Sequence, residues 1–364
     1  MYINELFEAK KAEAAVGKKQ EGMDLMGALV EGAGFTAENM NASSSFEKGQ
    51  TPVTQTLTDD EILGNVFVFM VAGHETAANT FHFSFVYLAM HLSSQRLLQK
   101  DLKDIFQGKP RSEWDYERDL PKLFGGMAGA VMNEVLRVVP PVVAIPKSVT
   151  VDRPQSIVLE GKKCLMPAGT LLNISAVGVH RNPKYWPAGP PSDPAHPIHP
   201  TSNVDNDLEE FKPQRWFIDQ SESKTKSSSD TNFHNGTYEA NDFMVNSTPD
   251  TASNLFRPPK GAYIPFSEGY RACLGRRFAQ VEILAVLATT FTEYSVELAV
   301  DEWASDEEVE RMSTEERRAV WEKAVAKARW LLLTCMGTRL TIQLRKGVVP
   351  LRFVKKGSER FNCV

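Results

Sequence analysis

The sequence lacks the features that would place it in several simple classes of protein. It holds only four cysteines in 364 residues, Cys164, Cys273, Cys335 and Cys363. They are far apart and form no C-x-x-C pair, which argues against a disulfide framework or a zinc module and favours a reducing compartment. Neither sign of charge dominates, since 41 Lys+Arg face 46 Asp+Glu. That balance excludes a strongly basic nucleic-acid binder. No internal repeat is visible.

Signals for export and for membrane insertion are also missing. Residues 1–22 are polar and rich in lysine, and they lack the apolar core of a secretory signal peptide. From Ile62 to Ser94 the only charged residue is Glu75, but several Asn and His residues interrupt the run. A spanning helix needs about 20 predominantly apolar residues. We therefore favour a buried helix and expect no membrane span, with a membrane-embedded helical protein as the lesser alternative.

The clearest element expected from the sequence is a long helix. Thr58 followed by Glu61, ahead of an apolar run, has the pattern of a capping box. The helix that begins there is expected to continue to Ser93, over roughly 50 Å at 1.5 Å per residue. It is apolar on most faces, which predicts that it runs through the middle of a sizeable core.

The remaining chain reads as helices followed by short strands. Weak helical periodicity from Met23 to Val30 precedes a Gly/Ser/Asn-rich stretch, Gly32–Gln50, which we interpret as a loop. Apolar residues at helical spacing fill 95–139, and Pro140-Pro141 should end that run. From Val142 to Val179 β-branched residues and the turn-like Glu160-Gly161-Lys162 predict short strands. Residues 181–216 are rich in proline and read as loops.

Four further segments follow toward the carboxyl end. The polar stretch 220–254 cannot bury enough apolar surface to offset its ordering entropy, so it is expected to be a flexible surface insertion. Residues 276–292 and 302–330 are predicted helices. Leu340–Phe353 alternates like a terminal hairpin.

One cysteine lies in a loop of unusual composition. Residues 266–275 read F-S-E-G-Y-R-A-C-L-G and precede the helix expected at 276–292. Gly269 and Gly275 flank Cys273, and glycine permits backbone angles that let a loop pack closely under a flat ligand. Arg271 and the amino terminus of the helix both favour the thiolate of Cys273. Taken alone, however, a cysteine is most often a small buried hydrophobe.

The spacing F-x-x-G-x-R-x-C-x-G resembles the haem-ligand signature of the cytochrome P450 family. The resemblance implies that Cys273 binds haem iron, and that Phe266, Gly269, Arg271 and Gly275 form the cofactor-binding loop around it. A thiolate is the axial ligand that pushes electron density onto haem iron for O–O cleavage.

A second motif lies inside the long helix. Ala72-Gly73-His74-Glu75-Thr76 is similar to the family's oxygen-binding A-G-x-D/E-T motif, with Ala77 where a further Thr or Ser is common. A glycine and a hydroxyl in mid-helix favour a local kink. The resemblance implies that Ala72 and Gly73 contact the cofactor, that dioxygen is held beside Thr76, and that Thr76 and Glu75 assist proton delivery. The alternative is a polar pair on an exposed helix face.

Two further motifs follow in the family's order. Glu134 and Arg137 match E-x-x-R, and Phe211–Trp216 matches F-x-P-x-R-W, which contributes Arg215. An exposed pair of this kind would contribute only about 0.2–0.5 kcal/mol. A buried one is structural, because removal of one partner costs about 3–5 kcal/mol. The resemblance implies a buried network of Glu134, Arg137 and Arg215, with a surface salt bridge as the alternative.

The resemblance covers nearly the whole chain but only the carboxy-terminal half to two-thirds of the family's fold, which is mainly α with small β-sheets. It identifies residues 1–364 as a partial, amino-terminally truncated domain of the eukaryotic microsomal, fungal-like type. Within this domain it implies a long oxygen-binding helix at 58–93, an insertion at 220–254, and the haem-ligand loop with its helix at 266–292.

The resemblance implies a monooxygenase that inserts one oxygen atom from O2 into a small apolar organic substrate. The cofactor would be haem b (iron protoporphyrin IX), and electrons would come from NADPH-cytochrome P450 reductase. A basic face of Lys260, Arg271, Arg276 and Arg277 would dock that acidic partner, unless these side chains are merely solvated charges.

Two further expectations concern location and activity. The intact family member would lie at the cytosolic face of the endoplasmic reticulum membrane, and a chain without an anchor would be cytoplasmic. The alternative to an enzyme is a truncated haem-binding or structural remnant without turnover.

Overall fold

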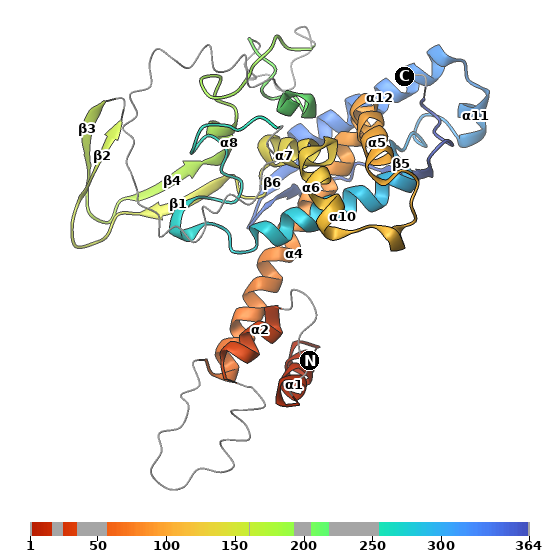
Figure 1. Ribbon diagram of the computed structural model, residues 1–364. Helices are drawn as coiled ribbons and strands as arrows, with labels where there is room; N and C mark the ends of the chain where they lie inside the picture. The colour runs from red at the N-terminus through yellow and green to blue at the C-terminus, as the bar shows by residue number, and fades with distance from the viewer. Residues whose placement is uncertain are drawn as a thin grey trace, which may run out of the picture. The chain divides into compact units, whose positions relative to one another are not determined.

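The computed structural model describes residues 2–16, 25–34, 57–159, 161–192, 205–217 and 255–362. Helices make up most of the described elements, and the strands form only two-stranded antiparallel sheets (Figure 1). The fold is therefore mainly α with small β-sheets, as the sequence predicts. The chain divides into two compact units, residues 1–75 and 76–364.

The first unit is a small helical cluster. Helices α1 (Tyr2–Ala15) and α2 (Leu25–Gly32) precede the first part of α4 (Asp59–Met90). Its core consists of Phe7, Met26, Val30, Ala33, Ile62 and Val66. Helix α2 agrees with the weak periodicity of the sequence. Helix α1 was not predicted, because its polar, lysine-rich sequence carries little apolar patterning.

Helix α4 begins as the sequence predicts and ends earlier. The backbone amide of Thr58 donates to the Glu61 carboxylate (2.8 Å), and the amide of Glu61 donates to Thr58 Oγ1 (3.3 Å), so the capping box is confirmed. The predicted end at Ser93 is wrong. The helix ends at Met90, and His91 adopts φ −122° and ψ 70° before α5 (Leu92–Phe106) begins. The Tyr87 carbonyl accepts both the backbone amide and the ring Nδ1 of His91, each at 2.9 Å.

Helix α7 (Met127–Val138) lies at the centre of a group of packed helices in the second unit, and its twelve residues are all buried. The helices packed with it include α5, α6 (Tyr116–Gly125) and α10 (Arg276–Glu293), and a short 3-10 turn η1 (Arg111–Glu113) joins α5 to α6. The backbones of α6 and α7 lie very close together where the two helices meet. A Cβ added at Gly129 would lie 2.0 Å from the Phe124 carbonyl oxygen, so only glycine fits there. Val138 is the last helical residue before Pro140-Pro141, where the sequence predicts the end.

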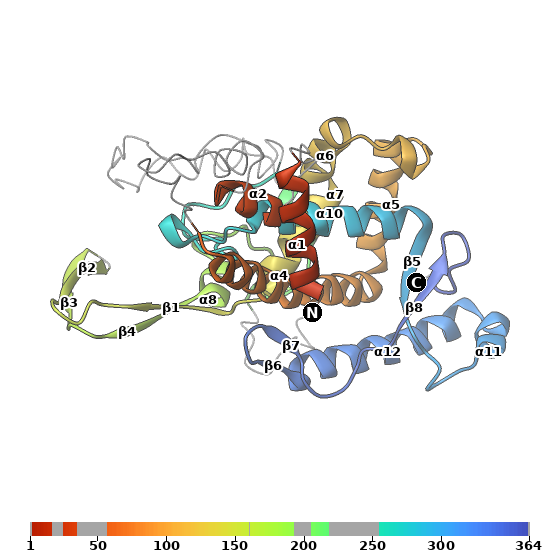
Figure 2. The ribbon, with the colours of Figure 1, turned by 90° about the horizontal axis from the view of Figure 1, so that it is seen from below.

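Short strands follow, as predicted for Val142–Val179. Strand β1 (Ala144–Ser148) pairs with β4 (Leu171–Ser175), and β2 (Gln155–Leu159) pairs with β3 (Lys162–Met166). Gly161 between β2 and β3 has φ +77°, a left-handed conformation that favours glycine and reverses the chain. Figures 1 and 2 both show the β2–β3 hairpin extending away from the helices of this unit.

The hairpin predicted at Leu340–Phe353 is wrong. Its strands β7 (Ile342–Leu344) and β8 (Leu351–Lys355) do not pair with each other. Strand β7 pairs with β6 (Met336–Thr338), and β8 pairs with β5 (Tyr294–Leu298), which directly follows α10. Alternation identifies a strand but carries no information about its partner. The helix expected at 302–330 is two helices, α11 (Asp306–Arg311) and α12 (Thr314–Cys335).

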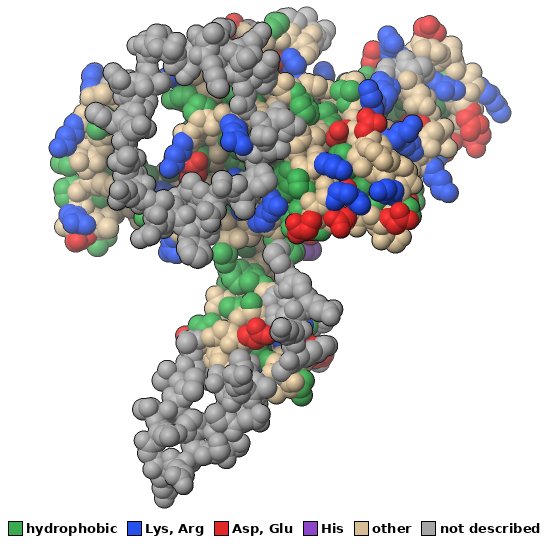
Figure 3. Space-filling view, viewed as in Figure 1, with side chains coloured by type: hydrophobic (Ala, Val, Ile, Leu, Met, Phe, Trp, Pro, Cys, Tyr) green, Lys and Arg blue, Asp and Glu red, His purple; other side chains and the backbone are tan. Residues whose placement is uncertain are grey.

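Several expectations lie partly or wholly outside the described residues. The insertion expected at 220–254 lies entirely there, as does most of the loop expected at Gly32–Gln50. Among the helices that the structure describes, none combines the length and apolarity required to cross a membrane. On the face drawn in Figure 3, basic and acidic side chains are interspersed over the helical part of the second unit.

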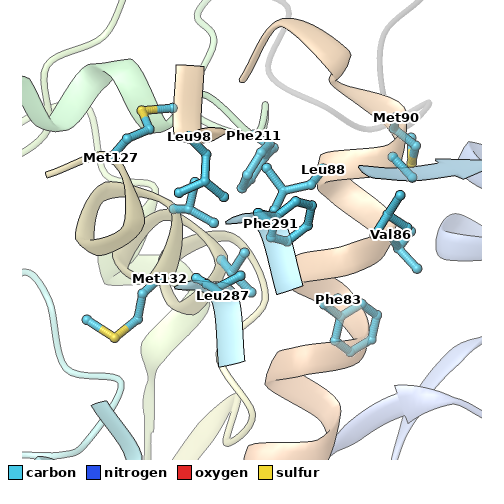
Figure 4. Packing of buried hydrophobic residues seen from close by; sticks show 14 of the residues in the cluster. Phe83, Val86, Leu88, Met90, Leu98, Met127, Met132, Phe211, Leu287 and Phe291 are labelled. Atoms are coloured by element: carbon cyan, nitrogen blue, oxygen red, sulfur yellow. The ribbon is translucent and has the colours of Figure 1, made fainter. Parts of the chain in front are cut away.

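The core of the second unit includes only one part of α4. Phe83, Val86, Leu88 and Met90 are buried there with side chains from α5, α7 and α10, and Figure 4 shows Leu88 and Phe291 turned toward each other. In the other part of α4 four large apolar side chains are 44–59% exposed, namely Phe67, Val68, Met70 and Val71. The prediction that α4 is buried along its length is therefore wrong for its first half.

Candidate functional site

The loop that carries Cys273 is held by its own backbone. The amide of Cys273 donates to the Phe266 carbonyl (2.8 Å), and the amide of Ala272 donates to the Gly269 carbonyl (2.9 Å). Between them lies the 3-10 turn η3 (Gly269–Arg271). Ser267 and Gly269 adopt φ +60° and +76°, so two left-handed residues turn the chain back on itself. At position 269 the backbone therefore adopts an angle that favours glycine, as the sequence predicts for this loop.

Cys273 lies immediately before helix α10. Gly275 is the N-cap residue of that helix with φ −81°, a backbone angle open to any residue, so its conformation does not require glycine. The Arg276 amide donates to the Cys273 carbonyl (3.4 Å). The thiol is free and its residue is exposed, which excludes the alternative of a small buried hydrophobe. A sulfur at a helix amino terminus lies where the helix dipole favours an anion.

The surroundings of Cys273 suit a flat apolar ligand bound through one thiolate. Three large side chains within five residues of the cysteine in the sequence, Tyr270, Leu274 and Phe278, are 108%, 68% and 59% exposed. A haem iron takes a single axial thiolate. The described residues contain no group of three His, Cys, Asp or Glu side chains that could hold a metal ion. A single exposed thiol at a helix amino terminus is a donor that fits a haem iron.

Two cavities of the second unit lie elsewhere. One of about 120 Å³ is lined by residues of α12 and of the segment that follows β5. Another of about 420 Å³ lies against α5 and α6. Cys273 stands on an exposed surface instead.

The charged residues of the E-x-x-R and F-x-P-x-R-W motifs meet inside the second unit. Arg137 donates to the Glu134 carboxylate through Nε and Nη2, both at 2.8 Å, and Arg215 donates through Nε at 2.9 Å. The side chains of Glu134 and Arg137 have no exposed surface, and that of Arg215 is 2% exposed. A surface salt bridge is thereby excluded. Helix α7 supplies the first two residues, and the 3-10 helix η2 (Pro213–Phe217) supplies the third.

Further donors complete this buried network. The backbone amide of Lys212 and the indole Nε1 of Trp216 each donate to Glu134 at 2.9 Å. Asp207 accepts from Arg215 Nη1 (3.3 Å) and from Lys212 Nζ (2.8 Å). Sequence reasoning did not assign roles to Asp207, Lys212 or Trp216. The adjacent letters P-Q-R-W contained a signal for Trp216, whereas nothing in the sequence pointed to Asp207.

The environment of Glu134 keeps it ionised. Burial alone would raise the pKa of its carboxyl, but the charges of Arg137 and Arg215 and five hydrogen bonds outweigh that effect and lower the pKa below its usual value. Asp207 follows the same pattern, with burial opposed by its bonds to Lys212 and the Gly189 amide. The network is therefore a set of fixed charges at neutral pH, and it forms a rigid support rather than a group that titrates.

The oxygen-motif residues lie on consecutive positions of α4. Ala72 and Gly73 are exposed, whereas Glu75 and Thr76 are half-buried. The helix is continuous through all of them, and the Thr76 carbonyl accepts a bond from Thr80 Oγ1 (2.8 Å). The two compact units divide between Glu75 and Thr76, inside the motif.

The four residues of the expected basic face differ in exposure. Lys260 and Arg271 are exposed. Arg276 and Arg277 are half-buried, with their guanidinium groups 5.8 Å and 4.4 Å from the ring centres of Phe266 and Phe124. A guanidinium at this distance from an aromatic ring is attracted to it. Two of the four cations therefore have aromatic partners within the chain, which narrows the open basic surface to Lys260 and Arg271.

Comparison with known proteins gives a consistent result. The chain is 26% identical over 283 residues to a cytochrome P450 monooxygenase of Arthrobotrys oligospora, an alignment that covers 78% of this chain and 42% of the relative. It is 28% identical over 300 residues to cytochrome P450 monooxygenase 124 of Postia placenta, covering 82% of this chain and 43% of the relative. Mouse thromboxane-A synthase is 32% identical over 182 residues, 48% of this chain and 32% of the relative.

The chain thus spans less than half the length of these relatives. A sequence model of the family described as Cytochrome P450 matches residues 1–321, a range that includes the cysteine loop and the buried carboxylate network. On the strength of that match, the chain belongs to the cytochrome P450 family.

Proposed function

We propose that this chain contributes the haem-thiolate centre of a monooxygenase, with Cys273 as the iron ligand. The observation that carries the proposal is the exposed, free thiol of Cys273 at the amino terminus of α10. Its loop is fixed by the hydrogen bond from the Cys273 amide to the Phe266 carbonyl. Haem b, when bound, supplies the dioxygen chemistry by which one oxygen atom is inserted into a substrate.

The chain's own residues would support this chemistry in distinct ways. Phe266, Gly269, Arg271 and Gly275 shape the loop around the sulfur. On α4, the exposed Ala72 and Gly73 leave room beside the helix. Glu75 and Thr76 carry a carboxylate and a hydroxyl, groups that would assist proton delivery in this chemistry. The buried network of Glu134, Arg137 and Arg215 would hold the framework under the cofactor.

The substrate and the partner follow from the family. A small apolar organic substrate is proposed on the strength of family membership. Electrons would come from NADPH-cytochrome P450 reductase, which would meet Lys260 and Arg271. The whole protein would work at the cytosolic face of the endoplasmic reticulum membrane, where that reductase operates.

The carbon monoxide difference spectrum of the reduced, haem-reconstituted chain tests the ligand. We expect a thiolate-type Soret band, because sulfur ligation changes the electronic structure of the iron. Cys273→Ser should abolish that band. The matched control is Cys335→Ser, which removes a half-buried thiol on α12 and should leave the band in place. A thiolate-type band that survives Cys273→Ser would overturn the assignment.

Turnover is a separate measurement that distinguishes an enzyme from a haem-binding remnant. One observation favours the remnant. The apolar side chains of Phe67, Val68, Met70 and Val71 on α4 are exposed, so water can reach that part of the helix. With reductase and NADPH, an enzyme converts an apolar substrate to a product containing one atom of labelled O2. A remnant shows the thiolate-type band and forms no product.

A further inference from the structure

A buried histidine lies between the E-x-x-R helix and the cysteine loop. His180, the last residue of α8 (Ala176–His180), has no exposed surface. Its Nδ1 lies 3.2 Å from the carbonyl oxygen of Arg137, and its Nε2 accepts the backbone N–H of Ile264 at 2.8 Å. These partners are far apart in the sequence, and one imidazole ring bonds to both.

The first of these bonds satisfies the end of α7. The last carbonyls of a helix have no intrahelical partner and need donors from elsewhere. His180 Nδ1–H supplies one to the Arg137 carbonyl, and the neighbouring Arg181 supplies another through Nη2 to the Val138 carbonyl (2.9 Å). Arg137 is also the residue whose side chain binds Glu134. His180 is therefore bonded to the backbone of the network itself.

The second bond reaches the beginning of the cysteine loop. Ile264 is buried, and its own carbonyl accepts the amide of Ser267 (3.1 Å), the residue with φ +60°. Within that turn, the Phe266 carbonyl accepts the amide of Cys273 (2.8 Å). A fixed Ile264 thus fixes the first turn of the loop, and that turn fixes the position of the cysteine.

The imidazole can make both bonds only in its neutral form with the proton on Nδ1. A ring nitrogen that accepts from a backbone N–H carries no proton, and the other must then donate to the carbonyl. The surroundings agree with this form. Burial, together with the nearby positive charges of Arg137 and Arg181, lowers the pKa of His180 to about 4. The Tyr263 ring, with its centre 5.2 Å from that of His180, covers one side.

We propose that His180 is a positioning residue that transmits the rigidity of the Glu134–Arg137–Arg215 network to the loop that presents Cys273. The role of Cys273 as iron ligand rests on the proposed function, whereas the link between α7 and the loop does not. The two therefore need separate measurements.

A matched pair of substitutions separates the two bonds of His180. The carboxamide of His180→Gln can donate to the Arg137 carbonyl and accept from the Ile264 amide, because it carries a donor and an acceptor. His180→Asn is shorter by one methylene, so it can reach the Arg137 carbonyl but not the Ile264 amide. Both variants place a neutral amide in the same buried position and differ in the bond under test.

The first readout is amide hydrogen exchange of residues 262–273 in the intact chain, which does not need haem. In His180→Asn the protection of the Ile264 amide should fall by about tenfold, the change expected for loss of one buried hydrogen bond. His180→Gln should retain most of the protection. A second control is Leu332→Ala, which removes a buried side chain of α12 and lowers stability without touching this link.

The second readout is the ratio of thiolate-type to thiol-type bands in the reduced, carbon monoxide-bound, haem-loaded chain. This ratio should fall in His180→Asn and recover in His180→Gln. Unchanged exchange at Ile264 in His180→Asn, or an equal loss of protection in Leu332→Ala, would overturn the proposal. If the wild-type chain shows no thiolate-type band, the proposed function fails while the exchange result still decides the link.

Discussion

Glu134→Gln is expected to destabilise the second unit severely, because it leaves two buried guanidinium groups without the carboxylate they share. Glu134 accepts five hydrogen bonds between 2.8 and 2.9 Å, three from Arg137 and Arg215 and two from the Lys212 amide and the Trp216 indole. Glutamine has one acceptor oxygen where glutamate has two, and its NH2 group would face N–H donors with which it cannot form hydrogen bonds. The charge is lost and at least one donor is left unpaired.

The size of the effect follows from this burial. Removal of one partner from a buried ion pair costs about 3–5 kcal/mol, a large part of the roughly 5–15 kcal/mol by which a typical domain is stable. Urea unfolding followed by circular dichroism measures it. At a slope of roughly 2 kcal/mol per molar urea, the midpoint should fall by roughly 1.5–2.5 M.

The same substitution in an exposed pair provides the control. Glu293 and Arg111 lie 2.9 Å apart with side chains 52% and 49% exposed, so Glu293→Gln should change stability by about 1 kcal/mol or less. The distance between the charged groups is nearly the same in both pairs, whereas Glu134 is buried and accepts bonds from two arginines and Glu293 is exposed. If Glu134→Gln unfolds at the same urea concentration as Glu293→Gln, the conclusion that the network supports the fold is refuted.

Three other measurements test the same structure. Because the pKa of His180 is lowered to about 4, the unfolded chain binds more protons between that value and about 6.5, so stability should fall as pH drops through this window. His180→Gln should flatten that loss when unfolding is measured at pH 7 and pH 5. Trp216→Phe removes one donor to a charged carboxylate and should lower the free energy of unfolding by about 1.5–3 kcal/mol. An unchanged urea midpoint would mean that the indole hydrogen bond does not contribute to stability. Leu88→Ala, in the core beside Phe291, should cost about 2–5 kcal/mol in the same assay, and Leu97→Ala at an exposed position of α5 should not.

Local signals in the sequence predicted local structure well. The Thr58 capping box, the end of a helix before Pro140-Pro141 and the turn at Gly161 each depend on neighbouring residues, and the structure has all three. The break at His91 was missed because the sequence around it contains no glycine or proline, the residues that most often signal the end of a helix. The hairpin at Leu340–Phe353 was wrong because strand pairing is a long-range choice that alternation cannot specify.

In the candidate site, too, features set by neighbouring residues were predicted and features set by distant contacts were not. The residues of the cysteine loop are consecutive, so a spacing pattern predicts them, and the E-x-x-R pair lies on one turn of a helix. Asp207 and His180 act through contacts to residues 8 and 43–84 positions away in the chain, and no periodicity connects such positions. What the structure adds is therefore the set of polar groups that surround the motifs.

The contact at Gly129 has a consequence for how this fold can vary. With the Phe124 carbonyl 2.0 Å from where a first side-chain atom would stand, even alanine at 129 must push α7 off α6. Glu134 lies little more than one turn further along α7, so such a shift would move its carboxylate away from the donors on η2. The absence of a side chain at position 129 thus sets the alignment of charges several ångströms away, and substitutions of this glycine are not tolerated by the packing of α6 against α7.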